Sequence, residues 1–450
     1  MSTAIVGLSR YFLVIFIAFY TFHCFIVFGC RNEREREAFY ISQNIFMIMI
    51  HVLGFAVLAI EDGSSDLMFL CAFQEIMFFA VIILYRIIYP DASKLLVNNM
   101  CMLLAISFIM LTRLSSAQRM QDQTAGGSAL LSDKGFRQFI IVAVTLAATM
   151  VIPYLVSKIK IIKRFTWWFG ISGIVILLAV MTAGTVTNGS KLTISIGAFS
   201  FQPSEFVKIL FVFFIAGMLS ESTDIIQLAS VSITAAAHVL ILVFSKDLGG
   251  ALIFFVVYVF MIYAATKKPV CLVGGAAGGV LATFIGYRLF AHVRTRFVAW
   301  RDPWSVIQGQ GYQITQSLFA IGTGSWFGMG LMQGSPDKIP IVAADFIFSA
   351  ISEEMGCLFS LCMVLICISN FLMFMNISMA VSDNYYRLIS LGLAVNYGFQ
   401  MFLTVGGVTK FIPLTGVTLP LVSYGGTSVL STLIMFSIIQ GIYIMRYSDD

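Results

Sequence analysis

Charged side chains are scarce in this 450-residue chain. Asp, Glu, Lys and Arg together make up 11% of it, whereas a soluble domain carries roughly 25%. In their place the sequence has 59% hydrophobic residues and 42 phenylalanines. This composition excludes a mainly soluble protein. It predicts an all-α fold, a polytopic bundle whose helices cross a membrane many times.

The sequence also lacks the motifs of metal-binding and nucleotide-binding proteins. Its eight cysteines lie in or beside apolar segments without CxxC or Cys/His metal spacing, so we interpret them as small apolar residues. The four histidines are scattered, and we expect no metal centre built from them. Neither a Walker loop nor a dinucleotide fingerprint occurs. The net charge of +5 is too small to indicate nucleic-acid binding, and no nucleic acid is expected as a partner.

Long apolar runs fill most of the chain. A helix needs about 20 apolar residues to cross a bilayer. By that measure we predict about thirteen spans, near 11–30, 40–60, 67–89, 94–113, 137–157, 167–186, 205–220, 226–245, 248–265, 270–291, 345–376, 385–408 and 420–445.

Basic residues gather in alternate short loops, which is typical of the cytoplasmic side of a membrane protein. Clusters at 31–36, 158–164 and 267–268 share one side if the N-terminus is outside. The C-terminus is then cytoplasmic, and the long loop 292–344 is external. The polar stretch 114–136 is predicted to be an external connection without chemistry.

The long loop leads into an apolar segment with carboxylates. Asp345 stands where loop becomes span, and partial desolvation there raises a carboxyl pKa toward a value useful for a base. A helix N-terminal carboxylate held by the dipole is an equal alternative. Glu353, about 80° further around an ideal helix, is expected on the Asp345 side. Within the loop, 315–322 is typical of a short amphipathic helix, and Arg296 is a candidate pyrophosphate ligand because arginine favours forked phosphate contacts.

Two further groups of ionisable residues lie near spans. In QPSEFVKIL, Pro203 suits a helix entry, and Glu205 and Lys208 are neighbours on one helical face. They form either a structural ion pair or a site in which Lys208 holds an anionic lipid phosphate. Asp247, in the turn at 244–250, is placed to pair with Lys208 or with a loop arginine.

The stretch 406–428 is interrupted by two prolines and by repeated Gly, Ser and Thr. Irregular backbone at membrane depth is tolerated where it lines a cavity or is buried in protein. We therefore predict that Lys410, Ser423 and Tyr424 line a cavity.

In this order, the motifs FQPSEFVKIL, KDLGGA, DPW…GYQITQS, ADFIFS and PLTGVTLPLVSYGGTS resemble the SEDS family of shape, elongation, division and sporulation proteins. The resemblance covers roughly 94–450 and implies a SEDS-type ten-helix glycosyltransferase core. Residues 1–93, with about three spans, are then an extra N-terminal transmembrane module. Ala343 and Ala344 stand where the family often has His-Thr.

The resemblance implies a multi-pass peptidoglycan glycosyltransferase of the bacterial plasma membrane. Such proteins polymerise lipid II into glycan strands, in elongation, division or sporulation, beside a class B penicillin-binding protein that acts as transpeptidase. The family's essential acidic residue falls on Asp345. Its other motif residues fall on Glu205, Lys208, Asp247 and Arg296.

Chemistry and resemblance together suggest a mechanism. Asp345 is the general base for the acceptor sugar's hydroxyl, and Arg296 and Lys208 stabilise the departing undecaprenyl pyrophosphate. The sequence requires no cofactor and admits a divalent cation. A flippase or other transporter of a lipid-linked oligosaccharide is one rival, because interrupted helices and buried charges suit it too. An inactive scaffold of the division machinery is another.

Overall fold

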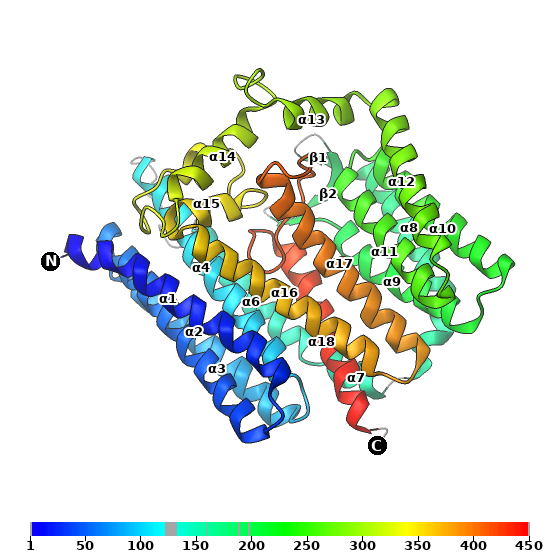
Figure 1. The fold of residues 1–450 in the computed structure, drawn as a ribbon, viewed down its shortest axis with the longest axis horizontal. Helices are drawn as coiled ribbons and strands as arrows, with labels where there is room; N and C mark the ends of the chain where they lie inside the picture. The colour runs from blue at the N-terminus through cyan, green and yellow to red at the C-terminus, as the bar shows by residue number, and fades with distance from the viewer. Residues whose placement is uncertain (1, 122–132, 159, 188–189, 197–198, 449–450) are drawn as a thin grey trace.

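A bundle of long helices makes up the computed structural model, which is described for residues 2–121, 133–158, 160–187, 190–196 and 199–448 (Figure 1). Twelve helices in these ranges are long and apolar enough to cross a membrane. The predicted multi-pass helical fold is confirmed. The predicted span 205–220 corresponds to α9, which is not among those twelve and whose 18 residues include the charged Glu205, Lys208 and Glu221.

The helices and strands follow one another along the chain as α1 (Ser2–Gly29), α2 (Glu33–Asp62), α3 (Asp66–Ile88), α4 (Lys94–Gln121), α6 (Lys134–Thr149), α7 (Ile152–Lys158), η1 (Lys160–Phe165), α8 (Thr166–Ala183), β1 (Thr185–Thr187), β2 (Ser190–Ile196), β3 (Phe199–Phe201), α9 (Ser204–Glu221), α10 (Ile225–Phe244), α11 (Leu248–Thr266), α12 (Val270–Leu289), α13 (Ala291–Arg301), α14 (Tyr312–Gly324), η2 (Pro336–Lys338), α15 (Ile347–Met355), α16 (Cys357–Ala380), α17 (Asn384–Val408) and α18 (Gly426–Ser448).

Helices α1 to α3 form a layer along one side of the bundle (Figure 1). Within the structure α1 packs against α2 and α16, and α2 packs against α4. Buried polar groups tie these helices together: the Tyr20 hydroxyl donates to Asn99 Oδ1 at 3.0 Å, and Asn99 Nδ2 donates to Asn370 Oδ1 at 3.0 Å. This buried hydrogen-bond network joins α1, α4 and α16 and so fixes the position of α1 against the other two helices.

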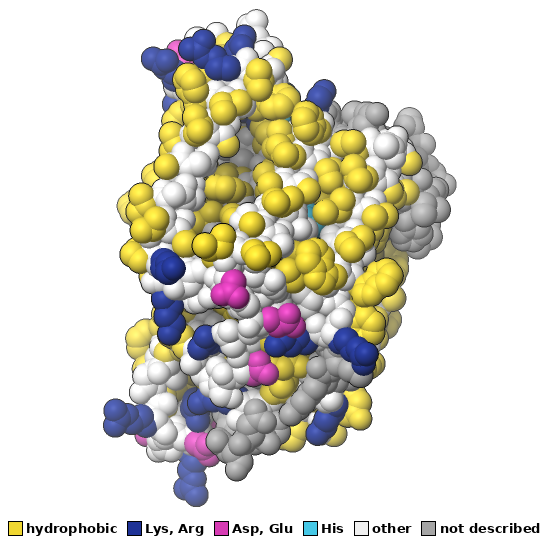
Figure 2. All heavy atoms as spheres, turned by 90° about the vertical axis from the view of Figure 1, so that its right-hand side faces the viewer, with side chains coloured by type: hydrophobic (Ala, Val, Ile, Leu, Met, Phe, Trp, Pro, Cys, Tyr) yellow, Lys and Arg dark blue, Asp and Glu magenta, His cyan; other side chains and the backbone are white. Residues whose placement is uncertain are grey.

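The opposite face of the molecule, which carries α10 and α12, is broadly hydrophobic, and Lys and Arg side chains gather toward its ends (Figure 2). On α12 no residue is buried. Ile226 and Ile233 of α10 are 82% and 72% exposed. Such large exposed apolar area is what lipid contact requires.

Our prediction of one helix over 345–376 is wrong. The helix α15 starts at Ile347, so Asp345 lies in the preceding irregular turn, and no acidic residue occupies the first turn of α15. Asp345 lies one residue before the N-cap Phe346, and within the described residues its carboxylate makes no capping hydrogen bond to α15. A second break separates α15 from α16 at Gly356, which has φ +93°.

The break at Gly356 exists because a distant loop inserts there. A Cβ on Gly356 would lie 2.3 Å from the backbone nitrogen of Gly328, so only glycine fits. Beyond it, the amide of Cys357 donates to Ser325 O at 2.9 Å, and the amide of Met329 donates to Glu353 O at 2.9 Å. The groups that a helix end leaves unpaired are thus satisfied by residues 325–330.

Three smaller features differ from the prediction or extend it. The span at 137–157 is divided into α6 and α7 beside Pro153, which lacks the amide that a continuous helix needs. A short antiparallel sheet in the order β1-β2-β3, not predicted, follows α8. The predicted helix 315–322 lies within α14. Of the predicted connection 114–136, residues 122–132 lie outside the described part of the chain.

A buried ion pair locks the long loop before Asp345 to the core. Arg113 of α4 lies 2.7 Å from Glu354 of α15, with side chains only 4% and 0% exposed. The same carboxylate accepts the backbone amides of Met332 at 3.2 Å and Gly334 at 3.3 Å. Arg113 in turn donates to Gly334 O at 3.1 Å. These contacts fix the loop that leads to Asp345.

We expect Arg113→Met to lower the free energy of unfolding by about 3–5 kcal/mol, because it leaves the Glu354 carboxylate buried without its partner. The double variant Arg113→Met, Glu354→Gln should lose less, since no buried charge remains. Unfolding in mixed micelles with increasing dodecyl sulfate, followed by circular dichroism, measures both. The exposed Arg301→Met is the control, and a double variant as unstable as the single one would contradict the explanation.

Candidate active site

A pocket of about 1070 Å³ surrounds Asp345. This is at the upper end of the range typical of ligand sites, about 300–1,000 Å³. Its walls come from α6, α13, the turn before α15, the irregular stretch 412–418 and the first turns of α18. Apolar side chains line it together with five ionisable groups, Arg137, Lys246, Asp247, Arg296 and Asp345.

Asp345 belongs to a turn whose backbone is held by hydrogen bonds from residues 423 and 424. Ser423 Oγ donates to Ala344 O at 2.5 Å, and the backbone amide of Tyr424 donates to Ala343 O at 2.8 Å. In contrast, the described residues provide no hydrogen bond to the Asp345 carboxylate itself. Gly416, at φ +74°, faces it, and a Cβ there would lie 3.5 Å from Asp345 Oδ2. The turn is therefore fixed while its carboxylate remains open to the pocket.

The surroundings of Asp345 suit a base. Burial raises the pKa of its carboxyl to about 6, although the positive charge of Arg296 opposes that rise. A base with a pKa near the working pH combines a sizeable ionised fraction with a useful affinity for the proton.

Arg296 reaches the pocket from α13. Its Nη1 donates to Thr415 O at 3.0 Å, which leaves other guanidinium nitrogens for a ligand. Burial lowers the pKa of Arg296, and the charges of Asp247 and Asp345 raise it. Four residues further along α13, the Trp300 indole donates to Lys410 O at 3.1 Å and holds α13 against the 410–416 segment. Arg296 is thus close enough to both carboxylates to interact with their charges.

Asp247 caps α11 and lines the pocket. Its Oδ1 accepts the backbone amide of Gly250 at 2.8 Å. Burial raises the pKa of this carboxyl, and the hydrogen bond from Gly250 opposes the rise. Asp247 and Asp345 are the carboxylates in this pocket able to hold a divalent cation.

Glu205 and Lys208 form the predicted pair, 2.9 Å apart. Lys208 also donates to Gln400 at 2.8 Å, and Glu205 accepts from Ser431 at 3.2 Å. Both side chains are buried outside the pocket lining. Of the two interpretations, this geometry favours the structural ion pair, which joins α9 to α17 and α18.

Comparison with known proteins identifies the family. The model described as cell cycle protein, for FtsW, RodA and SpoVE, matches residues 93–448. Peptidoglycan glycosyltransferase RodA of Mycobacterium tuberculosis is 33% identical over 325 residues, 68% of this chain and 69% of that protein. This chain belongs to the SEDS family. Stage V sporulation protein E of Bacillus subtilis is another SEDS relative, 34% identical over 284 residues, 61% of this chain and 76% of that protein.

Solved structures show the same SEDS fold. A chain from a peptidoglycan synthase complex, described as coordinating polymerization and crosslinking, has a TM-score of 0.64 at 22% identity, covering 80% of this chain and 99% of that one. Rod shape determining protein RodA of Thermus thermophilus has a TM-score of 0.58 at 21% identity, covering 79% and 98%. The SEDS match begins at residue 93, so α1 to α3 lie ahead of it.

Of the other residues predicted to form the SEDS site, some line the pocket and others lie outside it. Tyr424 lines the pocket, whereas Ser423 is buried behind it and holds the Asp345 turn. Lys410 lies outside the lining. Glu353 lies outside the pocket lining, and its Oε1 accepts the amide of Ser335 at 2.9 Å.

Sequence reasoning missed two cations of the pocket. Lys246 lies in the predicted turn at 244–250, but we assigned it no role in the site, and we did not consider Arg137. Lys246 has φ +65°, which places this non-glycine residue in a left-handed turn beside Asp247. Its adjacency to Asp247 in the sequence was the available signal. Nothing in the sequence around Arg137, at the start of α6, indicated that this residue would reach the pocket.

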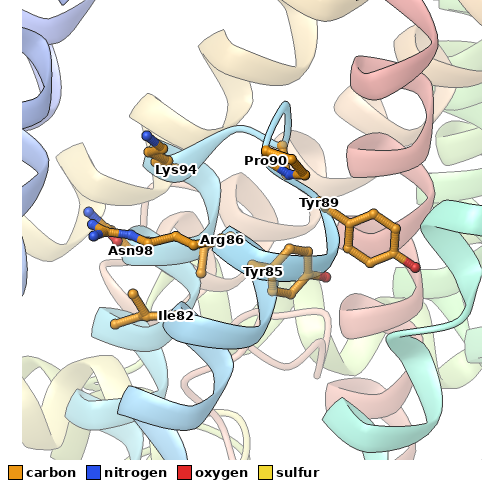
Figure 3. A pocket seen from close by; sticks show the side chains of 9 residues that line it. Ile82, Tyr85, Arg86, Tyr89, Pro90, Lys94 and Asn98 are labelled. Atoms are coloured by element: carbon orange, nitrogen blue, oxygen red, sulfur yellow. The ribbon is translucent and has the colours of Figure 1, made fainter.

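A second, much smaller cleft lies between the end of α3 and the start of α4 (Figure 3). Tyr85, Arg86, Tyr89 and Lys94 are among its lining residues, and it holds about 10 Å³, roughly the space of one water molecule. It is too small for a substrate.

Proposed function

We propose that this protein polymerises lipid II into peptidoglycan glycan strands. One observation carries the proposal: in a member of this family, the carboxylate of Asp345 has no hydrogen-bond partner among the described residues and lines a large pocket that also contains an arginine. Relatives matched over two thirds of the chain are themselves named peptidoglycan glycosyltransferases.

In the proposed reaction Asp345 removes the proton from the 4-hydroxyl of the acceptor sugar. That oxygen forms a bond to the anomeric carbon of the growing strand with inversion, the bond from this carbon to the pyrophosphate oxygen breaks, and undecaprenyl pyrophosphate leaves. Positioning both lipid-linked sugars in one pocket supplies much of the rate enhancement. The three cations Arg137, Lys246 and Arg296 line that pocket and favour a departing pyrophosphate.

These cations change our assignment of the leaving-group site. Lys208 is engaged by Glu205 and Gln400, so we assign pyrophosphate stabilisation to Arg296 with Lys246. Lys208 then acts only in positioning α9. A divalent cation at Asp247 remains compatible with this proposal.

The proposed setting is the outer face of the bacterial plasma membrane, with a class B penicillin-binding protein as partner. Arg10, near the N-terminus, donates to Gly328 O at 3.2 Å. This contact supports an N-terminus on the same side as the long loop, and the C-terminus lies toward the other end of the bundle (Figure 1).

Asp345→Asn should reduce polymerisation by about 10²–10⁴-fold, the usual contribution of a general base. Purified protein, alone and with a co-expressed class B transpeptidase, is given lipid II, and the glycan products are resolved on a gel. Asp302→Asn, an exposed carboxylate just after α13, is the matched control and should retain activity.

Equal ladders from wild type and Asp345→Asn would exclude the base. A folded wild-type protein that makes no ladder, yet moves lipid II across vesicle membranes, would favour transport instead.

The polymerisation rate should depend on pH through Asp345. Because the ionised carboxylate is the active form and its pKa is about 6, the rate should rise from pH 5, reach half its maximum near pH 6 and level off above pH 7. Single-turnover rates over this range measure the profile. A rate that falls with increasing pH over the same interval would contradict the assignment.

Arg296→Gln should have two effects. Loss of a preorganised cation should lower the rate about 10²-fold or more. It should also move the pH midpoint upward, because Arg296 now lowers the pKa of Asp345. Arg294→Gln, an exposed change on the same helix, should do neither. An unmoved midpoint would show that Arg296 does not act on Asp345 electrostatically.

A further inference from the structure

A cluster of three donor side chains lies far from the pocket, within α2 and α3. His51 of α2 faces Cys71 and Glu75 of α3, and one ligand atom of each lies within 4.8 Å of the others. Cys71 and Glu75 are four residues apart, so they share one face of α3. His51 Nδ1 is 2.8 Å from Glu75 Oε1 and 3.7 Å from Cys71 Sγ.

The cluster lies inside membrane spans. Glu33–Asp62 and Asp66–Ile88 are both long and apolar enough to cross a bilayer. The His51 side chain is fully buried, and that of Glu75 is 13% exposed. An ionisable residue at such a depth costs about 2.5 kcal/mol or more unless it is paired, and it indicates a function.

The hydrogen bonds of the cluster are incomplete. His51 Nε2 is 3.0 Å from Gln74 Oε1. If Nε2 carries the proton, the Nδ1 lone pair points at the Glu75 carboxylate, an unfavourable contact unless a proton or a metal ion lies between them. Buried Glu75 Oε2 and Gln74 Nε2 have no partner among the described residues. A proton there joins only Nδ1 and Glu75 Oε1, whereas a metal ion can be shared by all three donor atoms.

We propose that His51, Cys71 and Glu75 bind a divalent transition metal ion, with Zn²⁺ the best match. Imidazole nitrogen, thiolate and carboxylate are all zinc ligands, and a water molecule completes the usual four. Binding displaces the thiol proton of Cys71 to water. The thiolate and the carboxylate then balance the two positive charges, so the site is neutral, as the membrane interior favours.

The surroundings fit a structural metal site. Gln74 accepts from Nε2 and so directs Nδ1 to the metal, as partners behind metal-binding histidines do. The rings of Phe55 and Phe78 lie 4.8 and 5.4 Å from that of His51 and shield it. Phe78 also stacks on Phe108 of α4 at 5.9 Å. The ion would therefore clamp α2 to α3 where they adjoin the family core.

The test measures metal binding directly. Full-length protein without a polyhistidine tag is purified in detergent, stripped by a chelator and titrated with Co²⁺, a spectroscopic substitute for Zn²⁺. We expect about one Co²⁺ per chain, with thiolate-to-cobalt charge-transfer absorption that Zn²⁺ abolishes. Because lipid II is not used, failure here is distinguishable from failure of the proposed polymerase activity.

Three variants sharpen the result. Cys71→Ser should lose the charge-transfer band, whereas Cys367→Ser, which changes a buried cysteine of α16, should keep it. Gln74→Leu should keep the band but bind about 10–100-fold more weakly. A wild-type protein without stoichiometric Co²⁺ would overturn the proposal even if a variant misfolds. So would a band that survives Cys71→Ser.

Discussion

Two hydrogen bonds between irregular stretches of backbone hold the reactive end of this molecule together. Ser423 Oγ and the amide of Tyr424 both donate to the turn that precedes Asp345. Buried non-helical backbone persists only where other parts of the protein satisfy its polar groups. The 412–424 segment and the turn at 341–346 therefore depend on each other, and both line the pocket. Asp345 is free to react because its neighbours, rather than its carboxylate, make the structural contacts.

Much of this architecture could be predicted from the sequence because lipid imposes a simple requirement. Runs of about 20 apolar residues indicate spans, and the loss of that pattern at 406–428 correctly indicated irregular backbone. The same reasoning identified Asp345, Arg296, Asp247 and Tyr424, all of which line the pocket. Each of them stands where an apolar run ends or is interrupted.

What the sequence could not provide were contacts between segments distant in the chain. The break at Gly356 depends on a loop some thirty residues earlier, so the apolar run through it gave no warning. The spacing of Glu205 and Lys208 predicted that they are neighbours. It could not predict that Lys208 also donates to Gln400, because Gln400 lies on another helix. The cluster at His51 combines residues 20 and 24 positions apart on two helices, a spacing that matches no familiar metal motif.

The packing of α1 against α16 alters the outline of the molecule. The family match begins only at residue 93. The helix α1, which packs against α16, therefore lies before the matched region. Through Arg10 and Tyr11, the same helix touches the loop at Phe327 and Gly328. Neither lipid nor a foreign helix can lie in the place that α1 occupies. On this side the perimeter that the protein presents to its surroundings is therefore its own N-terminal segment, and recognition there is governed by the outer surface of α1 to α3.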